Sequence, residues 1–134
     1  PVAHMADLLW RFSLHPETTA DQGRAILGAA RSKVAPGAVA YSFNEPDRLA
    51  RAVSTVVARE LVPATEVVAW LESFAKPGAM EKWSDAFRTP PGMAELHNTK
   101  LFLRAMSDQL DGEDVDVEVS ATLASLVQGL TQLI

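Results

Sequence analysis

Apolar residues recur every three or four positions along most of the chain, which is the period of an α-helix with one buried face. The first such segment spans residues 2–14, and its apolar side chains share one helical face: Met5, Leu8, Leu9 and Phe12. Pro16 ends this helix, because a proline ring disfavours helical backbone at the residue before it. A second helix is predicted over residues 19–33, with Thr18 and Asp21 as its capping pair. Gly23 and Gly28 on this helix indicate close approach of a neighbouring helix.

Residues 44–47 form the clearest helix start in the chain. Asn44 is the expected cap, and Pro46 fits the first turn, where its missing N–H has no intrahelical partner to lose. The helix that follows carries one apolar stripe to about residue 61: Leu49, Ala52, Val53, Val56, Val57 and Leu61. Pro63 then separates this helix from a shorter one, which is predicted over residues 64–75.

The second half of the chain continues the same period. Met80, Trp83 and Phe87 predict a short helix over residues 79–88. Residues 93–110 are apolar on more than one side, so that helix is expected to be buried on several faces. Asp114 or Asp116 is the candidate cap of a last helix, whose apolar face holds Val119, Leu123, Leu126, Val127 and Leu130. The one candidate strand is residues 38–43.

These patterns predict an all-α fold of six to seven antiparallel helices joined by short proline-marked turns. The helices could form an α-α superhelix of the HEAT or armadillo type, or an irregular helical bundle. We expect residues 1–134 to be a single helical domain, either whole or as the C-terminal part of a longer helical-repeat protein.

Composition narrows the functional classes. The 134 residues are 48% hydrophobic and 22% charged, as in a folded globular protein. The absence of cysteine excludes disulfides, thiolate zinc sites and cysteine nucleophiles, and favours a cytoplasmic location. A net charge of −5 makes nucleic acid an unlikely partner. No apolar run is long enough to cross a membrane. A protein or peptide partner fits best, and a homodimer through the apolar terminal helices is an alternative.

Three stretches together resemble a known family. They are residues 2–9 (VAHMADLL) followed by His15-Pro16, residues 45–50 (EPDRLA) and residues 98–104 (NTKLFLR). In this order and spacing they are similar to a bacterial family with HEAT-like helical repeats, domain of unknown function 2785. The resemblance covers about residues 2–110 and implies a helical-repeat fold. Members of the family are generally longer, with helices upstream, and the family has no established activity that could be transferred.

Two polar clusters are candidate chemistry. His4, Asp7 and Arg11 share one helical face, so a histidine and a carboxylate one turn apart could bind a metal or share a proton. The structural alternative is an Asp7–Arg11 ion pair, and because zinc needs three or four ligands, no metal site is predicted. Glu45, Asp47 and Arg48 could add a second cluster, although capping and the helix dipole also explain these charges.

Asn98 is expected to be buried, where its amide must find partners. We expect it to tie a neighbouring loop or helix end. Ligand contact together with His97 or Arg104 is the alternative. The three tryptophans fall at core-compatible positions and are expected to be packing anchors: Trp10, Trp70 and Trp83.

No phosphate-binding glycine loop or nucleophile elbow is present, so no cofactor is expected. The leading hypothesis is a non-enzymatic domain for protein or peptide interaction. The alternative is a small-molecule or metal-dependent enzyme with a polar site around His4, Asp7, Glu45 and Asp47. The candidate ligand-binding residues are His4, Asp7, Asp47, Arg48 and Asn98.

Overall fold

The computed structural model describes residues 2–34 and 40–133, and the secondary structure of this part is entirely helical. Its elements are α1 (Val2–Leu14), α2 (Ala20–Val34), α3 (Glu45–Ala58), α4 (Ala64–Glu72), η1 (Ser73–Ala75), η2 (Trp83–Arg88), α5 (Pro90–Leu110) and α6 (Val117–Thr131), where η denotes a 3-10 helix. The predicted all-α fold is confirmed. Residues 40–43 of the candidate strand form no β-strand, and residues 38–39 lie outside the described part.

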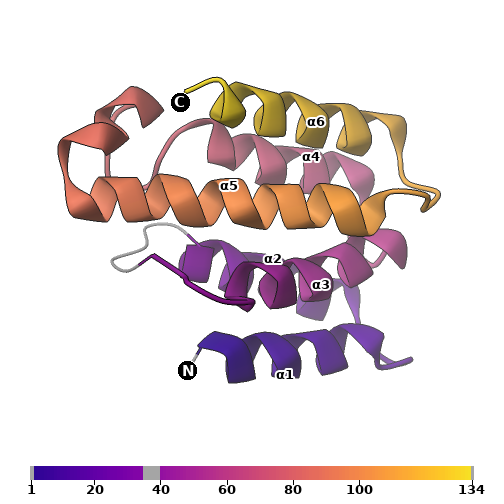
Figure 1. The fold of residues 1–134 in the computed structure, drawn as a ribbon. Helices are drawn as coiled ribbons and strands as arrows, with labels where there is room; N and C mark the ends of the chain where they lie inside the picture. Colours follow the sequence, from indigo (N-terminus) through magenta and orange to yellow (C-terminus); the bar gives the residue numbers. More distant parts are fainter. Residues whose placement is uncertain (1, 35–39, 134) are drawn as a thin grey trace.

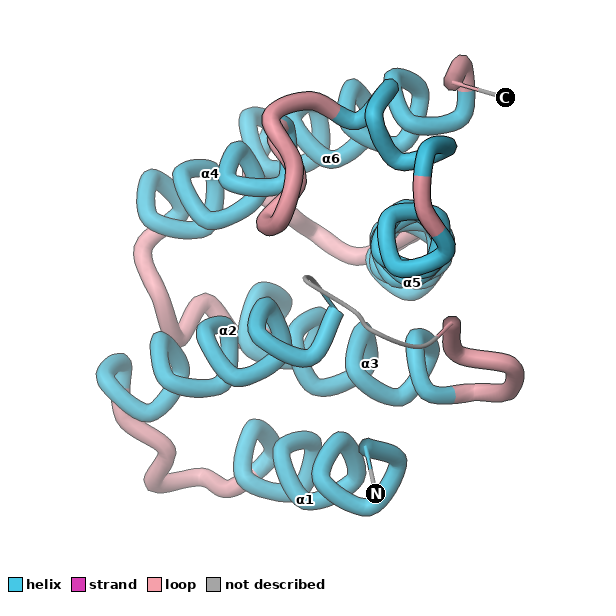
Figure 2. Tube along the Cα trace, turned by 90° about the vertical axis from the view of Figure 1, so that its left-hand side faces the viewer, coloured by secondary structure: helices cyan, strands magenta, loops and turns pink. Residues whose placement is uncertain are grey.

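Successive α-helices alternate in direction and stack in layers (Figure 1). α3 packs against α1, α2 and α5, and α6 packs against α4 and α5. In the view of Figure 2, α2 and α3 lie between α1 on one side and α4, α5 and α6 on the other. Among the residues that the structure describes, α1 therefore forms the edge of the stack and has helical neighbours on one side only.

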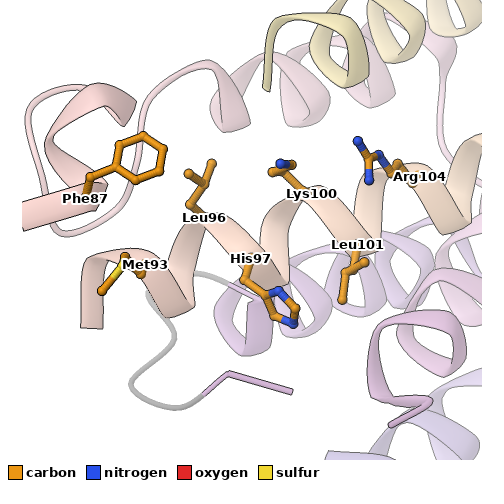
Figure 3. Close-up of a pocket in the computed structure, with 7 residues that line it drawn as sticks. All are labelled: Phe87, Met93, Leu96, His97, Lys100, Leu101 and Arg104. Atoms are coloured by element: carbon orange, nitrogen blue, oxygen red, sulfur yellow. The ribbon is translucent and has the colours of Figure 1, made fainter. Parts of the chain in front are cut away.

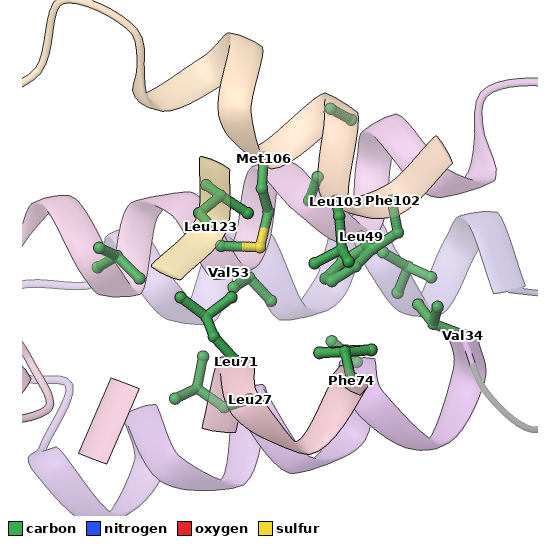
Figure 4. Packing of buried hydrophobic residues seen from close by; sticks show 14 of the residues in the cluster. Leu27, Val34, Leu49, Val53, Leu71, Phe74, Phe102, Leu103, Met106 and Leu123 are labelled. Atoms are coloured by element: carbon green, nitrogen blue, oxygen red, sulfur yellow. The ribbon is translucent and has the colours of Figure 1, made fainter. Parts of the chain in front are cut away.

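The core lies where the middle helices converge. Figure 4 shows Leu27, Leu49, Leu71, Phe102 and Leu123, from five different helices, directed into one cluster. The apolar stripe predicted for α3 is buried from Leu49 to Val57: Leu49, Ala52, Val53, Val56 and Val57 are each at most 7% exposed. The last predicted member, Leu61, lies beyond the end of α3 at Ala58 and is half-buried. Full burial of one such large side chain contributes roughly 1.5–3 kcal/mol, so this stripe fixes α3 at the centre of the stack.

Aromatic side chains fill the side of the core next to α4. The Trp70 and Phe74 rings meet edge to face, with centroids 5.2 Å apart, and Phe102 lies 5.8 Å from Phe74. The indole N–H of Trp70 donates to the Leu27 carbonyl at 3.0 Å, and that of Trp83 donates to the Phe74 carbonyl at 2.9 Å. Both tryptophans are therefore packing anchors, as predicted.

Two helix starts differ from the prediction. The capping box of α2 is formed by Thr19 and Gln22, not by Thr18 and Asp21: Gln22 N–H donates to Thr19 Oγ1 at 3.2 Å, and Thr19 N–H donates to Gln22 Oε1 at 2.9 Å. Thr18 is unavailable because its hydroxyl donates to the Phe12 carbonyl at the end of α1. Asn44 stands at the start of α3, but its side chain makes no capping hydrogen bond.

The helix predicted over residues 79–88 is wrong in type and length. Its observed part is η2, which begins at Trp83 because the backbone at Lys82 is extended, with φ −148° and ψ 154°. Phe87, expected on its buried face, is 51% exposed. α5 begins at Pro90, earlier than predicted, because the Thr89 hydroxyl accepts a hydrogen bond from Gly92 N–H at 3.0 Å. Asp116 caps α6, as expected.

The two glycines of α2 have different surroundings. A Cβ at Gly23 would lie 3.0 Å from Val62 Cγ2 and 3.3 Å from Leu61 Cβ, so a close approach is confirmed there. The chain that approaches is the segment after α3, and not a helix as predicted. A Cβ at Gly28 would have no heavy atom within 4 Å, so the same prediction for Gly28 is wrong.

Candidate functional site

Asp7 joins α1 to α3 through two arginines. Its Oδ1 accepts a hydrogen bond from Arg51 Nη2 at 3.2 Å, and its Oδ2 lies 3.6 Å from Arg48 Nη1. The Arg51 guanidinium also stacks over the Trp10 ring, 3.7 Å from its centroid. In the described part of the chain, the ion pairs of Asp7 are made with α3, so the expected pair with Arg11 on its own helix is wrong. Arg11 instead lies on the exposed side of α1.

An open hollow of about 400 Å³ lies beside this contact. It is lined by Asp7, Asn44, Asp47, Arg48, Arg51 and Gln109. Gln109 Nε2 donates to the Asp47 carbonyl at 3.0 Å, which ties the end of α5 to the start of α3. The structure therefore brings together three of the five candidate ligand-binding residues: Asp7, Asp47 and Arg48.

The charges of this hollow balance, with two arginines facing two aspartates. The Asp7, Arg48 and Arg51 side chains are 36–42% exposed, so their ion pairs are solvated. Exposed pairs of this kind contribute about 0–1 kcal/mol. The arrangement accounts for these residues as a contact between α1 and α3, and ligand binding by them stays a prediction.

The other two candidates, His4 and Asn98, lie away from this hollow. His4 is exposed on α1. Asn98 on α5 is fully buried, and its Oδ1 accepts a hydrogen bond from Tyr41 N–H at 2.8 Å. The neighbouring His97 Nε2 lies 3.0 Å from the Tyr41 carbonyl, so α5 holds both backbone groups of this residue. The interpretation of Asn98 as a buried tie to a neighbouring loop is confirmed.

Tyr41 is anchored from its side chain as well. Its hydroxyl donates to the Lys33 carbonyl at the end of α2. Burial, with a smaller contribution from the Glu45 carboxylate, raises the pKa of Tyr41, so the phenol stays protonated as this hydrogen bond requires. Tyr41 thus links α2 to α5 at the point where the chain enters α3.

A metal bound by His4 and Asp7, which share one helical face, would need at least one further ligand. Within residues 2–34 and 40–133, no three His, Asp or Glu side chains are placed so that they could hold one metal ion. His4 and Asp7 therefore form a pair without a third protein ligand in this part of the chain.

A larger apolar groove, of about 690 Å³, runs between α1 and α2. Its apolar lining includes Leu9 from α1 and Ala25, Ile26 and Ala29 from α2, and its polar lining includes His15 and Gln22. Phe12 lines it while 55% exposed, and on the same helix Leu8 is 51% exposed. The predicted apolar face of α1 is therefore only partly buried inside the domain.

Hydrogen bonds from Arg59 hold the C-terminal end of α1 beside this groove. Arg59 Nη1 donates to the Ser13 carbonyl and to the His15 carbonyl, the latter at 3.0 Å. These bonds, with that of Thr18, satisfy carbonyl groups that a helix end leaves without intrahelical partners. The groove is thus framed by backbone that is bonded to α3.

Sequence reasoning missed this groove because periodicity marks a face as apolar and does not say what covers it. Phe12 was assigned to the buried face of the first helix on spacing alone. The available signal was the width of the stripe, since Trp10 stands beside Phe12 and extends the apolar surface around α1.

Residues 1–107 match the family described as "Protein of unknown function (DUF2785)". The chain belongs to this family. The matched residues hold the whole α1–α2 groove, as well as Asp7, Asp47 and Arg48, so these features lie in the part that defines a DUF2785 member. Neither the curated proteins nor the solved structures gave a match. No helix in the described part of this DUF2785 member is both long and apolar enough to span a membrane.

Proposed function

We propose that this DUF2785 member is a non-enzymatic interaction domain that binds an amphipathic helix of a partner protein in the groove between α1 and α2. The observation that carries the proposal is the exposure of Phe12 in a groove whose lining is mainly apolar. A large contiguous apolar surface on a folded protein is typical of an interaction site.

The shape and chemistry of the groove favour a helix as its occupant. Helices dock into grooves through apolar residues at i, i+3, i+4 and i+7, and α1 and α2 here supply small and large apolar contacts side by side. Burying Phe12 and Leu9 under such a helix would contribute roughly 1.5–3 kcal/mol for each side chain that is fully covered. The polar groups of the lining, which include His15 and Gln22, would orient the partner.

We further propose that the stack is HEAT-like, with the partner helix in the position of a further layer. Alternating antiparallel helices in layers support this reading, since each repeat of such an array contacts only its neighbours (Figure 2). A reducing, cytoplasmic site of action is part of the proposal, and the absence of cysteine supports it.

The test uses a synthetic amphipathic helical peptide, with leucine at i, i+3, i+4 and i+7 and glutamine elsewhere, titrated into the isotopically labelled domain. We expect NMR shift changes at Leu9, Phe12 and Ile26. An Ala25→Arg variant, which places a long cation in the groove, should weaken binding at least tenfold. Its matched control is Ala121→Arg, an exposed alanine of α6, which should bind as the wild type does.

Two results would overturn the proposal. One is a peptide that causes no shift changes in the groove at millimolar concentration. The other is a concentration-dependent dimer in sedimentation experiments that Ala25→Arg abolishes, because the occupant would then be a second copy of this chain.

A further inference from the structure

A third depression, of about 250 Å³, lies along α5 next to η2. It is apolar at one end and basic at the other. Figure 3 shows Phe87, Met93 and Leu96 near the N-terminal end of α5, and Lys100 and Arg104 further along the same helix. It is separate from the α1–α2 groove, with which it shares no lining residue.

The apolar end is accessible to a ligand. Phe87 is 51% exposed and Met93 is 47% exposed, although Leu96 beneath them is buried. Phe87 comes from η2 and faces the side chains of α5, so two elements of the fold form this end together (Figure 3). An apolar side chain of a ligand could lie between them and be shielded from water.

The positive charges at the basic end are not balanced by carboxylates in the described part of the chain. Lys100 and Arg104 are one turn apart on α5, and in the described part of the chain neither forms an ion pair with a carboxylate. Like charges at this spacing repel each other. Burial, and to a smaller extent the charge of Arg104, lowers the pKa of Lys100. Arg104 Nη2 donates to Thr131 Oγ1 at 2.9 Å, which fixes the guanidinium near the basic end.

This pocket contrasts with the rest of the molecule. The protein carries a net charge of −5, yet the lining of the pocket contains no acidic side chain. In the hollow beside Asp7, in comparison, both arginines pair with the Asp7 carboxylate. An anionic group beside Lys100 would relieve the repulsion from Arg104, so the pocket is complementary to a ligand that is both apolar and negatively charged.

We propose that this pocket binds an acidic segment of a partner protein, in which an apolar side chain is followed by carboxylates about one to two helical turns away. The apolar side chain occupies the end formed by Phe87 and Met93, and the carboxylates face Lys100 and Arg104. From Leu96 to Arg104 the rise along α5 is about 12 Å, which sets the spacing that the segment must span. The proposal goes beyond the α1–α2 groove and does not depend on it.

The test compares three peptides with the same leucine positions, in which the remaining residues are glutamate, glutamine or lysine. Binding is followed by fluorescence anisotropy and by NMR. Judged by the NMR shifts of Leu96, Lys100 and Arg104, we expect the glutamate peptide to bind this pocket at least tenfold more tightly than the glutamine peptide at low ionic strength, and the lysine peptide not to bind there. The preference should shrink on going from about 20 mM to about 500 mM salt, because partly exposed charges are screened.

Matched variants locate the effect. Lys100→Glu should weaken binding of the glutamate peptide at this pocket by at least tenfold, and Lys100→Gln, which matches glutamate in size but carries no charge, should weaken it less. Lys76→Glu makes the same change in net charge at an exposed position outside the pocket and should leave binding unchanged. Thermal melting of each variant establishes that it is folded before binding is measured.

Equal binding of the glutamate and glutamine peptides would overturn the proposal, as would an equal loss in Lys76→Glu and Lys100→Glu. Shift changes confined to the α1–α2 groove would also overturn it, and they would leave the proposed function of that groove intact. Shift changes at Leu96, Lys100 and Arg104 that disappear in Lys100→Glu would support it.

Discussion

Replacing Asn98 with alanine tests whether its amide is a structural tie. In the folded protein this buried oxygen accepts a hydrogen bond of 2.8 Å from Tyr41 N–H. Alanine removes the acceptor and leaves a backbone donor without it. We expect Asn98→Ala to lower the free energy of unfolding and to leave α5 helical, because alanine is a good helix former.

The size of the effect follows from burial. Leaving a buried donor without its acceptor costs about 1–3 kcal/mol. For a domain of this length we expect Tm to fall by about 3–5 °C for each kcal/mol. His97→Ala is the matched control, because its ring contacts the carbonyl of the same residue from an exposed position. The control should cost less than half as much.

The assay is urea unfolding followed by circular dichroism, with thermal melting as a second measure. An unchanged slope together with a lower midpoint would assign the change to stability. The reasoning is refuted if Asn98→Ala costs less than about 0.5 kcal/mol, below the range for a buried hydrogen bond. It is also refuted if His97→Ala costs as much, since burial would then not decide the effect.

Two further predictions concern α2. Gly28→Ala should raise Tm, because alanine is more stable than glycine within a helix by about 0.5–1 kcal/mol. Gly23→Ala should lower Tm, because the new Cβ would meet Val62 at 3.0 Å. Thermal melts in which Tm rises for both variants would contradict this prediction. The hydrogen bond from Arg24 lowers the pKa of Glu66 below 4.5, so its stabilisation is present above that pH and lost as the pH falls through the lowered value. Glu66→Gln should therefore show a smaller fall in Tm below pH 4.5 than the wild type, and an equally steep fall would contradict the assignment.

The fold class could be predicted from the sequence because the helical period is long and repeated. The stripe from Leu49 to Val57 is nearly free of interruptions, and it proved to be the central contact of the stack. Proline marked the ends of elements for a local reason, since its ring restricts the residue before it. Signals of this kind depend on a few neighbouring residues, so the folded protein keeps the local structure that they predict.

The details that failed depend on contacts between distant residues. The spacing of Met80, Trp83 and Phe87 fits a helix, but the Trp83 indole is bonded to the Phe74 carbonyl and the backbone enters η2 from an extended Lys82. Thr18 has the chemistry of a cap, yet its hydroxyl donates to the Phe12 carbonyl. Local pattern cannot rank such competing partners.

Only part of the candidate site could be predicted, because its contacts also depend on residues that are distant in the sequence. Spacing placed His4, Asp7 and Arg11 on one face of α1, but Asp7 turned out to contact two arginines of α3. Which charged residue meets Asp7 depends on how α1 and α3 cross, which the sequence of either helix does not contain. Asn98 was predictable because a polar residue on an apolar face must be bonded wherever its partner comes from.

The packing of α1 explains why the same helix could serve both the fold and a partner. Its buried residues are small, Ala6 and Ser13, so α1 lies close against the domain, while Phe12 and Leu8 are directed away from that contact. A helix needs one apolar stripe to join a stack, and a wider apolar surface exposes side chains to water at roughly 25 cal/mol for each Å² left uncovered. A helix laid in the α1–α2 groove would cover Phe12. Substituting Phe12 with serine should therefore leave the free energy of unfolding nearly unchanged and weaken peptide binding, whereas a core residue such as Phe102 would affect stability first.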